Sequence, residues 1–371
     1  MSTSTILPTQ GSGAERDMPR VGAEALERFG VACFTAMGLT ADDARVCADA
    51  LMQSELRYHP GQGQGIKRLL SYRERIEQGR VDIHAPFEVL KESPALALVD
   101  AHNGLGSVIG RRAMELACDK AAVCGIGAVV VRGSTHYGSS SVHARTALER
   151  GYVGVAFTNA GPEMAAWGGR TPVVGTNPWG IAAPTGAEFP VVLDIALTTA
   201  GKGMMRFLAD RSEPMPRDWA LTPDGEETDD PTAAMAGALL GIGQYKGVGL
   251  SFFTDVLTGV ISGGAFGLTP YSDPAKLDVA HTFLAFDVGW FMPPEEFHAR
   301  MQAFIAEVKS SALRPGFDEV LVPGELEHRR EVAKRADGVP LPNADLERLA
   351  ALGEGLGVDA SALRAALGAS A

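Results

Sequence analysis

A histidine and an aspartate stand beside or within apolar runs, where a side chain can reach the edge of a β-sheet. His136 follows a run that ends in the polar residues Ser134 and Thr135, so its ring should leave the sheet and enter a cleft. Histidine can donate or accept a proton near neutral pH. Asp194 interrupts the apolar run 191–196, where a carboxylate without a partner would be costly. The alternatives are a histidine that braces the next helix and an aspartate that bonds backbone amides.

Two further segments could hold a negatively charged group. One is a tight turn with backbone amides and small polar side chains, formed by Gly175, Thr176, Asn177 and Pro178. Such a turn suits a pyrophosphate or an amide. The other is Lys246, which precedes a helical pattern whose small residues begin at Gly247, so that its ammonium and the helix N-terminus could both face phosphate. Both segments are also ordinary turn and capping sequences.

The glycine-rich segment 104–110 follows a strand pattern and opens a helical one, as the phosphate-binding turn of a dinucleotide-binding domain does. Its third glycine is one residue late, however. The next strand pattern ends in Arg132 and Gly133, where an acidic residue would be expected. We therefore interpret the segment as a strand-to-helix turn with another use.

Helical spacing dominates both ends of the chain. Near the N-terminus it covers residues 21–38, a segment opened by Thr40 and closed at Arg57, and residues 66–78 after the glycine-rich turn 59–65. Near the C-terminus three more helical patterns cover residues 325–336, 343–352 and 360–367. We expect the two ends to build one helical lobe together.

The middle of the chain has short apolar runs that are typical of buried strands. They cover residues 96–100, 126–132, 153–159, 191–195 and 282–288. Helical patterns at residues 109–122 and 140–150 separate the first three runs, and this order favours an α/β core. Residues 214–230 are polar and rich in proline, which predicts a long surface loop or lid.

Length, charge and cysteine content indicate the number of lobes and the kind of partner. A chain of 371 residues with 46% hydrophobic residues should form two or three lobes. The formal net charge of -12 disfavours nucleic acid and anionic membranes as partners, and no run of eighteen apolar residues predicts a membrane span. The four cysteines lack a C-x-x-C pair, which predicts reduced, buried thiols rather than disulfides or a metal site. We expect a cytoplasmic protein that acts on a small molecule.

Short motifs follow one another along most of the chain. They are Ser-Thr-His-Tyr-Gly at 134–138, Phe-Thr-Asn-Ala at 157–160, Trp-Gly-Gly at 167–169, Gly-Thr-Asn-Pro at 175–178, Val-Leu-Asp-Ile-Ala at 192–196, Lys-Gly-Val-Gly-Leu at 246–250, Asp-Val-Leu-Thr-Gly at 255–259 and Pro-Gly-Glu at 323–325. Over residues 55–330 this ordered series resembles the malate/L-lactate dehydrogenase-like family. That family includes dehydrogenases of malate, sulfolactate and ureidoglycolate, a diketogulonate reductase and a cyclic-imine reductase.

The resemblance implies an α/β fold that is not a Rossmann fold, with a mixed-sheet cofactor lobe and a helical lobe in a homodimer. It implies NAD or NADP, no metal, and hydride transfer between the nicotinamide and C2 of a 2-oxo or 2-hydroxy acid or of an analogous imine. His136 would be the catalytic or cofactor-facing histidine, Arg68 would hold the substrate carboxylate, and Asp194 would orient a catalytic group. The residues implied at the cofactor are Thr158, Asn159, Gly175, Thr176, Asn177, Pro178, Lys246, Gly247, Gly324 and Glu325. For Arg68 the alternative is a solvated helix face.

The chain departs from the family in the turn before Arg68. The resemblance implies Ser-His-Gly there in many relatives, and alignment backward from Arg68 and Tyr72 places Gln64 at the position of the histidine, with about two extra residues upstream. Glutamine can hydrogen-bond a carbonyl but cannot transfer a proton at a useful pKa. His59 from the enlarged loop or His136 could supply the proton instead, or the substrate could need little acid catalysis. His59 could equally be an exposed loop residue.

Three functional hypotheses follow. The leading one is an NAD(P)-dependent oxidoreductase of small 2-oxo and 2-hydroxy acids. The second, indicated by Gln64, is a reductase of a cyclic or N-alkyl imino acid. The third is a catalytically silent relative, which the retention of His136, Arg68, Asp194 and Lys246 argues against. The expected organisation is a flexible tail at residues 1–19, a helical lobe of residues 20–82 with 313–371, and a mixed α/β core of residues 83–312.

Overall fold

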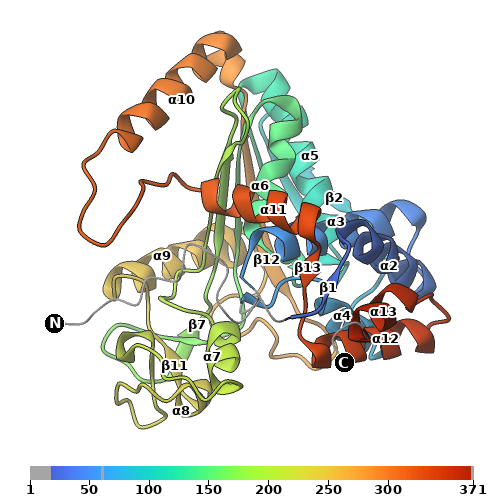
Figure 1. The fold of residues 1–371 in the computed structure, drawn as a ribbon. Coiled ribbons are helices and arrows are strands. Elements are labelled where there is room, and N and C mark those ends of the chain that lie inside the picture. The colour runs from blue at the N-terminus through green and yellow to red at the C-terminus, as the bar shows by residue number, and fades with distance from the viewer. Residues whose placement is uncertain (1–17, 60–61, 369–371) are drawn as a thin grey trace.

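A seven-stranded mixed sheet forms the centre of the molecule (Figure 1). The structure, a computed structural model, describes residues 18–59 and 62–368. In sheet order the strands are β2 (Glu88–Glu92), β3 (Leu96–Asp100), β4 (Ile126–Ser134), β12 (Val279–Phe286), β5 (Val153–Thr158), β8 (Trp179–Ala183) and β9 (Val191–Ile195). Only β3 and β4 run parallel, and every other neighbouring pair is antiparallel.

Helix α5 (Gly106–Cys124) connects the parallel strands β3 and β4, and with α6 (Ser140–Thr146) it packs on the sheet. Small residues permit this close approach, because a Cβ on Gly127 would lie 1.9 Å from the carbonyl oxygen of Ala117. The expected β-α-β-α-β order is present in the sequence, but β12 lies between β4 and β5 in space. Local patterns do not reveal this insertion, because β12 is more than a hundred residues away from both neighbours.

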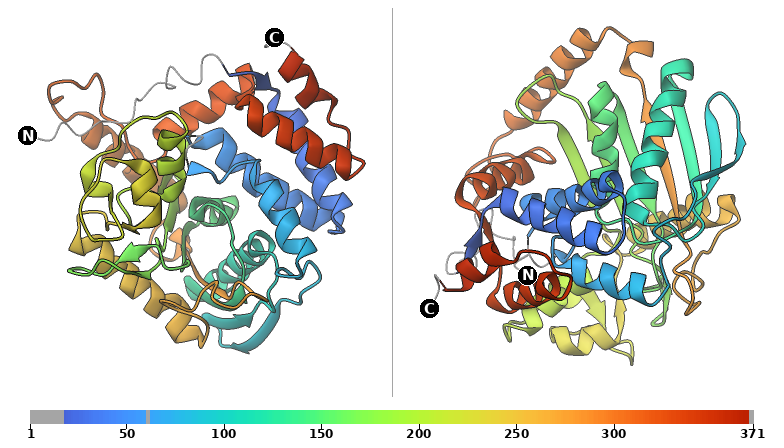
Figure 2. Two further views of the ribbon diagram at one scale, coloured as in Figure 1. Left: turned by 90° about the horizontal axis from the view of Figure 1, so that it is seen from below. Right: turned by 90° about the vertical axis from the view of Figure 1, so that its right-hand side faces the viewer.

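The two ends of the chain form a common helical core, as the blue and red segments of Figures 1 and 2 show. The helices are α2 (Ala23–Ala36), α3 (Ala41–Arg57), α4 (Arg68–Glu77), α12 (Asn343–Gly355) and α13 (Ser361–Gly368). The short strands β1 (Arg20–Val21) and β13 (Val339–Pro340) pair antiparallel beside them. As predicted, Thr40 caps α3 by accepting a hydrogen bond from the backbone amide of Asp43 at 3.2 Å. The mixed sheet and this helical lobe confirm the predicted fold class.

A smaller lobe with its own core is built from residues that lie before β8 and after β9 in the chain. Its sheet has the order β10 (Ala220–Leu221), β11 (Ala238–Leu239), β6 (Met164–Ala165) and β7 (Pro172–Val174), and its helices are α7 (Lys202–Ala209) and α8 (Pro231–Ala236). Methionines fill the core, which includes Met164, Met205 and Met215. Residues 214–230 were expected to form a surface loop, but they contribute β10 and the buried Met215 to this lobe.

The α-helices of the described residues not yet placed are α9 (Tyr245–Asp255), which continues as a π-helical turn over Val256–Val260, α10 (Pro294–Lys309) and α11 (Glu325–Asp337). Helix α11 lies against the C-terminal end of α3, where Arg57 and Glu331 form a buried ion pair at 3.1 Å. Lys334 adds hydrogen bonds to the carbonyl oxygens of Glu55 and Tyr58. Helix α11 therefore fixes the point at which α3 ends.

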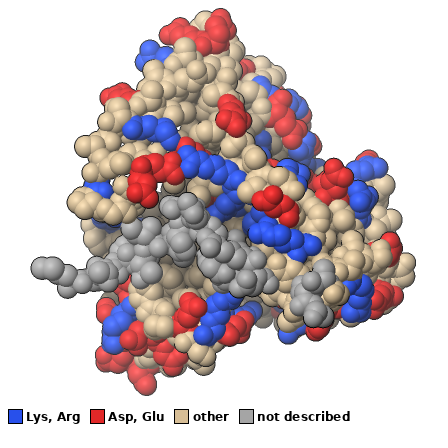
Figure 3. Space-filling view, in the orientation of Figure 1, with Lys and Arg blue, Asp and Glu red and all other residues tan. Residues whose placement is uncertain are grey.

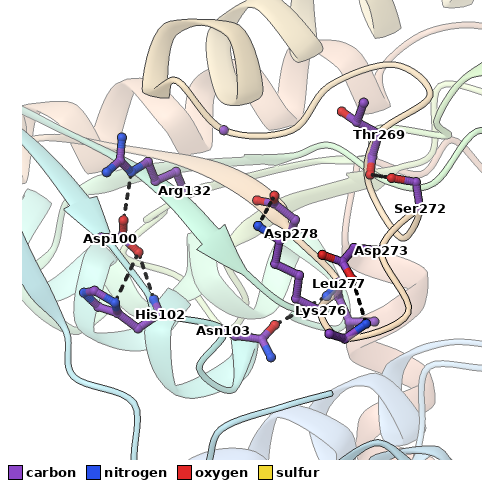
Figure 4. Close-up of polar contacts among 12 residues, drawn as sticks. Asp100, His102, Asn103, Arg132, Thr269, Ser272, Asp273, Lys276, Leu277 and Asp278 are labelled. Carbon is purple, nitrogen blue, oxygen red and sulfur yellow. Dashed lines mark hydrogen bonds and ion pairs between the residues drawn. The ribbon is translucent and has the colours of Figure 1, made fainter. Parts of the chain in front are cut away.

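Loops at one end of the central sheet are joined by polar contacts (Figure 4). Asp100 accepts hydrogen bonds from the side chain of Arg132 at 2.9 Å and the amide of His102 at 3.0 Å. The glycine-rich segment that follows has a packing role. A Cβ on Gly106 would lie 2.4 Å from the carbonyl oxygen of Thr135, so only glycine lets the start of α5 approach this strand end.

All four cysteines are free thiols, and Cys33, Cys47 and Cys118 are buried. Burial raises the pKa of Cys118 to about 11. Within residues 18–59 and 62–368, no cluster of three or more histidine, cysteine or acidic side chains could hold a metal ion. None of the helices in that part of the chain is both long and apolar enough to cross a membrane. On the face shown in Figure 3, acidic and basic side chains are interspersed.

Candidate active site

The loop between α3 and α4 is held from within by a buried carboxylate. Glu55 accepts a hydrogen bond from the backbone amide of Ile66 at 2.8 Å. A Cβ on Gly65 would lie 1.8 Å from the same carboxylate, so a glycine is required at this point. Arg68, in the first turn of α4, donates from Nε to the carbonyl oxygen of Gly63 at 2.8 Å. These contacts fix the loop that carries Gln64 and Arg68.

The guanidinium of Arg68 is partly buried and has no acidic partner among the described residues. None of the described carboxylates lies within ion-pair distance of it. Burial lowers the pKa of Arg68, and the charges of Arg75 and Arg206 lower it further, although a guanidinium stays protonated in proteins. Burial raises the pKa of the nearby Glu163, while Lys202, Arg68 and Arg206 act in the opposite direction. This region therefore has an excess of positive charge and can accept an anionic group.

His136 is fixed through its backbone and has a free ring nitrogen. The preceding residue, Thr135, is bonded to the start of α5. Its hydroxyl donates to the carbonyl oxygen of Gly104 and accepts from the amide of Gly106. The hydroxyl of Tyr72 donates to the carbonyl oxygen of His136 at 3.3 Å. The ring atom Nδ1 is buried and has no hydrogen-bond partner among the described residues. Burial, and then the charge of Arg68, hold the pKa of His136 well below its usual range, so the ring is neutral.

Asp194 is joined to a tyrosine and a serine rather than to His136. Its Oδ2 accepts hydrogen bonds from the Ser141 hydroxyl at 2.6 Å and the Ser141 amide at 3.2 Å. The Ser141 hydroxyl is also 2.5 Å from the phenol oxygen of Tyr58. Burial raises the pKa of Asp194, while the hydrogen bonds from Ser141 and Tyr58 lower it. The structure thus places Arg68 near His136 and places Asp194 in a separate hydrogen-bonded group.

Gln64 and His59 lie in the same loop. Gln64 Oε1 is buried and has no hydrogen-bond partner among the described residues. Gln64, His59 and Tyr58 line one cavity of about 20 Å³. The ring of His59 packs edge-on against Phe207 of α7, with 4.9 Å between the ring centroids. This contact joins the loop to the smaller lobe.

The polar side chains expected at the cofactor mostly brace the loops on which they lie. Asn177, in a left-handed backbone conformation with φ of 35°, accepts from the amide of Ala160 and donates to the carbonyl oxygen of Ser251. Asn159 makes the same two kinds of bond to Ala280 and Ala265. The remaining contacts are Thr158 with His281, Gly175 with Ser251, Thr176 with Leu197, and Pro178 with Thr158. Cofactor contacts in this turn would therefore come mainly from the backbone.

The first residues of α9 and α11 differ in whether their charged side chains are available to a ligand. Lys246 is exposed in the first turn of α9, and Gly247 packs against the chain after β9, since its Cβ would lie 2.3 Å from the carbonyl oxygen of Leu197. At α11, Gly324 has φ of 87° and a Cβ there would meet Val192. Both oxygens of Glu325 are occupied by Lys309, at 2.6 and 2.7 Å. Lys246 therefore remains available to an anion, whereas Glu325 is engaged within the fold.

The structure adds residues that sequence reasoning missed. Tyr58 and Ser141 complete the hydrogen-bonded group around Asp194, and Lys202 and Arg206 add charge near Arg68. Asp255 is a buried carboxylate beside Asn159 and Asn177, and burial raises its pKa. Tyr58 directly precedes His59, the loop histidine singled out from the sequence, and this neighbourhood was the signal that could have directed attention to it. Lys202 and Arg206 gave no such signal, because solvated helices commonly carry basic residues.

Comparison with known proteins identifies the family. A family model for malate/L-lactate dehydrogenase matches residues 21–350. Malate dehydrogenase of Pyrococcus horikoshii is 34% identical over 92% of this chain and 96% of that protein. (2R)-3-sulfolactate dehydrogenase (NADP(+)) of Chromohalobacter salexigens is 32% identical over 88% of this chain and 95% of that protein. The solved structure of the Pyrococcus horikoshii malate dehydrogenase matches with a TM-score of 0.85 at 32% identity, over 93% of this chain and 97% of that one. The predicted resemblance is confirmed, and the chain belongs to the malate/L-lactate dehydrogenase family of NAD(P)-dependent oxidoreductases.

Proposed function

We propose that the protein interconverts a small 2-hydroxy acid and the corresponding 2-oxo acid with NAD or NADP. The observation that carries this proposal is the partly buried guanidinium of Arg68, which has no acidic partner among the described residues and whose charge lowers the pKa of the neighbouring His136. A guanidinium can hold a carboxylate through two parallel hydrogen bonds. A neutral imidazole nearby can accept a hydrogen bond or a proton from the reacting hydroxyl.

Residues of this chain would hold the cofactor at three places. The backbone of the Gly175–Pro178 turn, together with the strand end at Thr158 and Asn159, supplies a rigid polar surface. The ammonium of Lys246 at the start of α9 is free for a phosphate, with Gly247 and the helix N-terminus behind it. Gly324 and Glu325 would act through the backbone at the start of α11. The bound nicotinamide would supply or accept the hydride.

The charges near Arg68 favour a substrate with a second acidic group. Lys202 and Arg206 of α7 act on Glu163 together with Arg68, so three cations face one carboxylate in this region. Malate and sulfolactate, after which the two relatives are named, both carry a second acid group. A substrate of this kind would balance the excess positive charge. The names of these relatives favour a hydroxy acid over an imino acid.

We also propose that two copies of the chain form a homodimer. Helix α10 projects from the body of the molecule (Figure 1) and has no buried residue over its length. Apolar side chains beside and along it are exposed, including Trp290, Phe291 and Phe304. A lone helix of this length is only marginally stable in water, so a second copy that covers it would stabilise it.

Light scattering tests the dimer. The wild type should have twice the chain mass, and Phe304→Glu should shift the equilibrium toward the monomer because it places a charge in the contact. Val123→Glu, at an exposed apolar residue of α5, is the matched control. A monomeric wild type at micromolar concentration would contradict the dimer. We further propose a cytoplasmic location, supported by four free thiols without a disulfide and tested by cell fractionation.

A binding and turnover screen tests the function. NADH and NADPH are titrated against tryptophan fluorescence in the presence of a chelator, and the tighter cofactor is used with oxaloacetate, sulfopyruvate and pyruvate. Reactions with and without methylamine separate ketone from imine reduction. We expect cofactor binding and turnover of a 2-oxo acid, with preference for substrates that carry a second acid group. Turnover only in the presence of amine would overturn the hydroxy-acid proposal.

A further inference from the structure

Helix α9, with the helical turns that continue it to residue 262, is polar on its inner side and apolar on its outer side. The residues that face the fold are small or polar, and they are Gly247, Ser251, Thr254, Asp255, Thr258, Gly259 and Ser262. The large apolar residues face outward, and they are Leu250, Phe252, Phe253, Leu257, Val260 and Ile261. All six are between 39% and 62% exposed. A surface helix of a single globular chain has the opposite arrangement, with its apolar stripe toward the core.

The inner side of α9 is held largely by hydrogen bonds. Ser251 Oγ donates to the carbonyl oxygen of Gly175 at 2.8 Å, and the Ser251 carbonyl oxygen accepts from Asn177 Nδ2 at 3.0 Å. Trp179 Nε1 donates to Thr254 Oγ1 at 2.8 Å. Most of the stability of a helix in a protein comes from packing of its apolar face. Since that face of α9 points away from the fold, the packing that stabilises it comes from another molecule.

The apolar surface continues beyond the helix and is large enough for a protein partner. Phe266 and Leu268, in the loop that follows, are 51% and 59% exposed. Together with the six apolar residues of the outer side of α9 they offer roughly 600–800 Å². Each partner in a stable interface contributes about 800 Å². Soluble monomers rarely leave an apolar patch of this size uncovered.

The charge pattern favours a second copy of this chain as the partner. Between Lys246 and Asp273 the sequence has one charged residue, Asp255, and it is buried. An anionic membrane would need basic side chains around the apolar ones, and the chain has a formal net charge of -12. Strongly apolar interfaces are typical of permanent homodimers rather than of transient complexes. Helix α9 lies on the same side of the molecule as the projecting helix α10 (Figures 1 and 2), so one partner can cover both.

We propose that a second copy of the chain covers the outer side of α9 and thereby fixes the helix that braces the cofactor turn. The inference rests on the proposed function, because it names the surface used by the proposed homodimer and its effect on the proposed cofactor site. Ser251 bonds to Gly175 and Asn177 of that turn, and Lys246 lies in the first turn of the same helix. Loss of the partner therefore loosens both groups and weakens cofactor binding.

Light scattering tests the contact. Phe253→Glu places a charge on the outer side of α9 and should raise the dissociation constant of the dimer by at least about thirtyfold, as loss of a central aromatic contact does. Val123→Glu is the matched control, because it places the same charge at an apolar residue of α5 that is 68% exposed. We expect this control to keep the mass of the wild type.

Photo-crosslinking tests the contact even if Phe253→Glu fails to fold. Benzoylphenylalanine in place of Phe253 keeps a large apolar ring at this position. Illumination should join two copies of the chain, and mass spectrometry of the product should identify this chain as the partner. Benzoylphenylalanine in place of Val123 should give little of this product.

Fluorescence titration tests the link to the cofactor. At the same protein concentration, Phe253→Glu should bind NADH or NADPH several-fold more weakly than the wild type, whereas Val123→Glu should bind it equally well. The two variants carry the same added charge, so a difference between them reports the contact and not the charge.

Three results would overturn the inference. They are a folded Phe253→Glu variant with the mass of the wild type, no crosslinked pair from position 253, or unchanged cofactor affinity in a dissociated Phe253→Glu variant. A monomeric wild type that sediments with vesicles of phosphatidylcholine and phosphatidylglycerol would also overturn it, since a membrane would then cover α9. A wild type that forms the crosslinked pair but turns over no substrate would count against the proposed function alone.

Discussion

Two buried histidines, one on α6 and one on β12, should make the protein less stable in mild acid. The rings of His143 and His281 both stack on Tyr137, with centroid distances of 4.4 and 4.5 Å, and all three residues are at most 1% exposed. Burial lowers the pKa of His143 to about 4 and that of His281 to about 3. Both rings are therefore neutral in the folded protein at pH 5. In the unfolded chain a histidine has a pKa of about 6.5.

The size of the effect follows from these pKa values. Below pH 6.5 the unfolded chain binds protons that the folded protein does not. The free energy of unfolding is therefore highest above the unfolded pKa and falls as the pH drops below it. For each histidine the free energy of unfolding falls by about 1.4 kcal/mol per pH unit in this window. At pH 5 the loss is about 2 kcal/mol for each histidine, and the two losses add because neither ring is yet protonated in the folded state. Together they amount to about 4 kcal/mol.

Urea unfolding at pH 7 and pH 5 measures this effect in wild type and His281→Gln. Glutamine can keep the hydrogen bond to Thr158 but takes up no proton. The wild type should lose about 2 kcal/mol more than His281→Gln between the two pH values. The raised pKa values of buried acids such as Glu55 act in the opposite direction, but they are common to both proteins and cancel.

The control for this experiment is His84→Gln, at an exposed histidine. This variant should follow the pH dependence of the wild type, because His84 is exposed and lies outside the buried cluster around Tyr137. The reasoning is refuted if His281→Gln and wild type lose the same stability between pH 7 and pH 5.

Three further predictions concern the loop and the site. Arg68→Lys should lower kcat/KM by at least about tenfold because it loses the bidentate contact with the carboxylate. Fluorescence titration should show unchanged cofactor affinity, and unchanged kinetics would place Arg68 on a solvated face. Gly106→Ala should displace the backbone of Thr135 and His136 and cost about 1–3 kcal/mol in urea unfolding, whereas Gly22→Ala, with open space around it, should cost far less. Lys334→Met should cost about 3 kcal/mol, because it leaves the carbonyl oxygens of Glu55 and Tyr58 without their buried donor; a loss below about 1 kcal/mol would contradict this role.

Much of the fold could be predicted because its signals are local. The capped helix after Thr40, the stop at Gly79 and the apolar runs of β3 and β9 lie within a few residues of their predicted bounds. The edge strand β2 has no buried residue, so it carries no alternating pattern, and α10 also has none. The position of β12 depends on pairing with strands far away in the sequence. Such pairing leaves no mark in a local pattern.

The candidate site was predictable in its residue types but not in its partners. Arg68 and His136 were singled out by position, and the structure places them close enough for the charge of Arg68 to lower the pKa of His136. Asp194 was known to need a partner because it interrupts an apolar strand. That the partner is Ser141, with Tyr58 behind it, depends on how α3 and α6 meet. No single segment of the sequence contains that contact.

Direct hydride transfer to C2 is the central claim, and an isotope label tests it most directly. The enzyme would be given a 2-oxo acid and reduced nicotinamide cofactor carrying deuterium at C4, and the product would be examined by mass spectrometry and proton NMR. We predict a 2-hydroxy acid with deuterium at C2, formed by the wild type and at a much lower rate by Arg68→Lys. A hydroxy acid without the label would contradict direct transfer, and a labelled amine formed only in the presence of methylamine would show that the substrate is an imine.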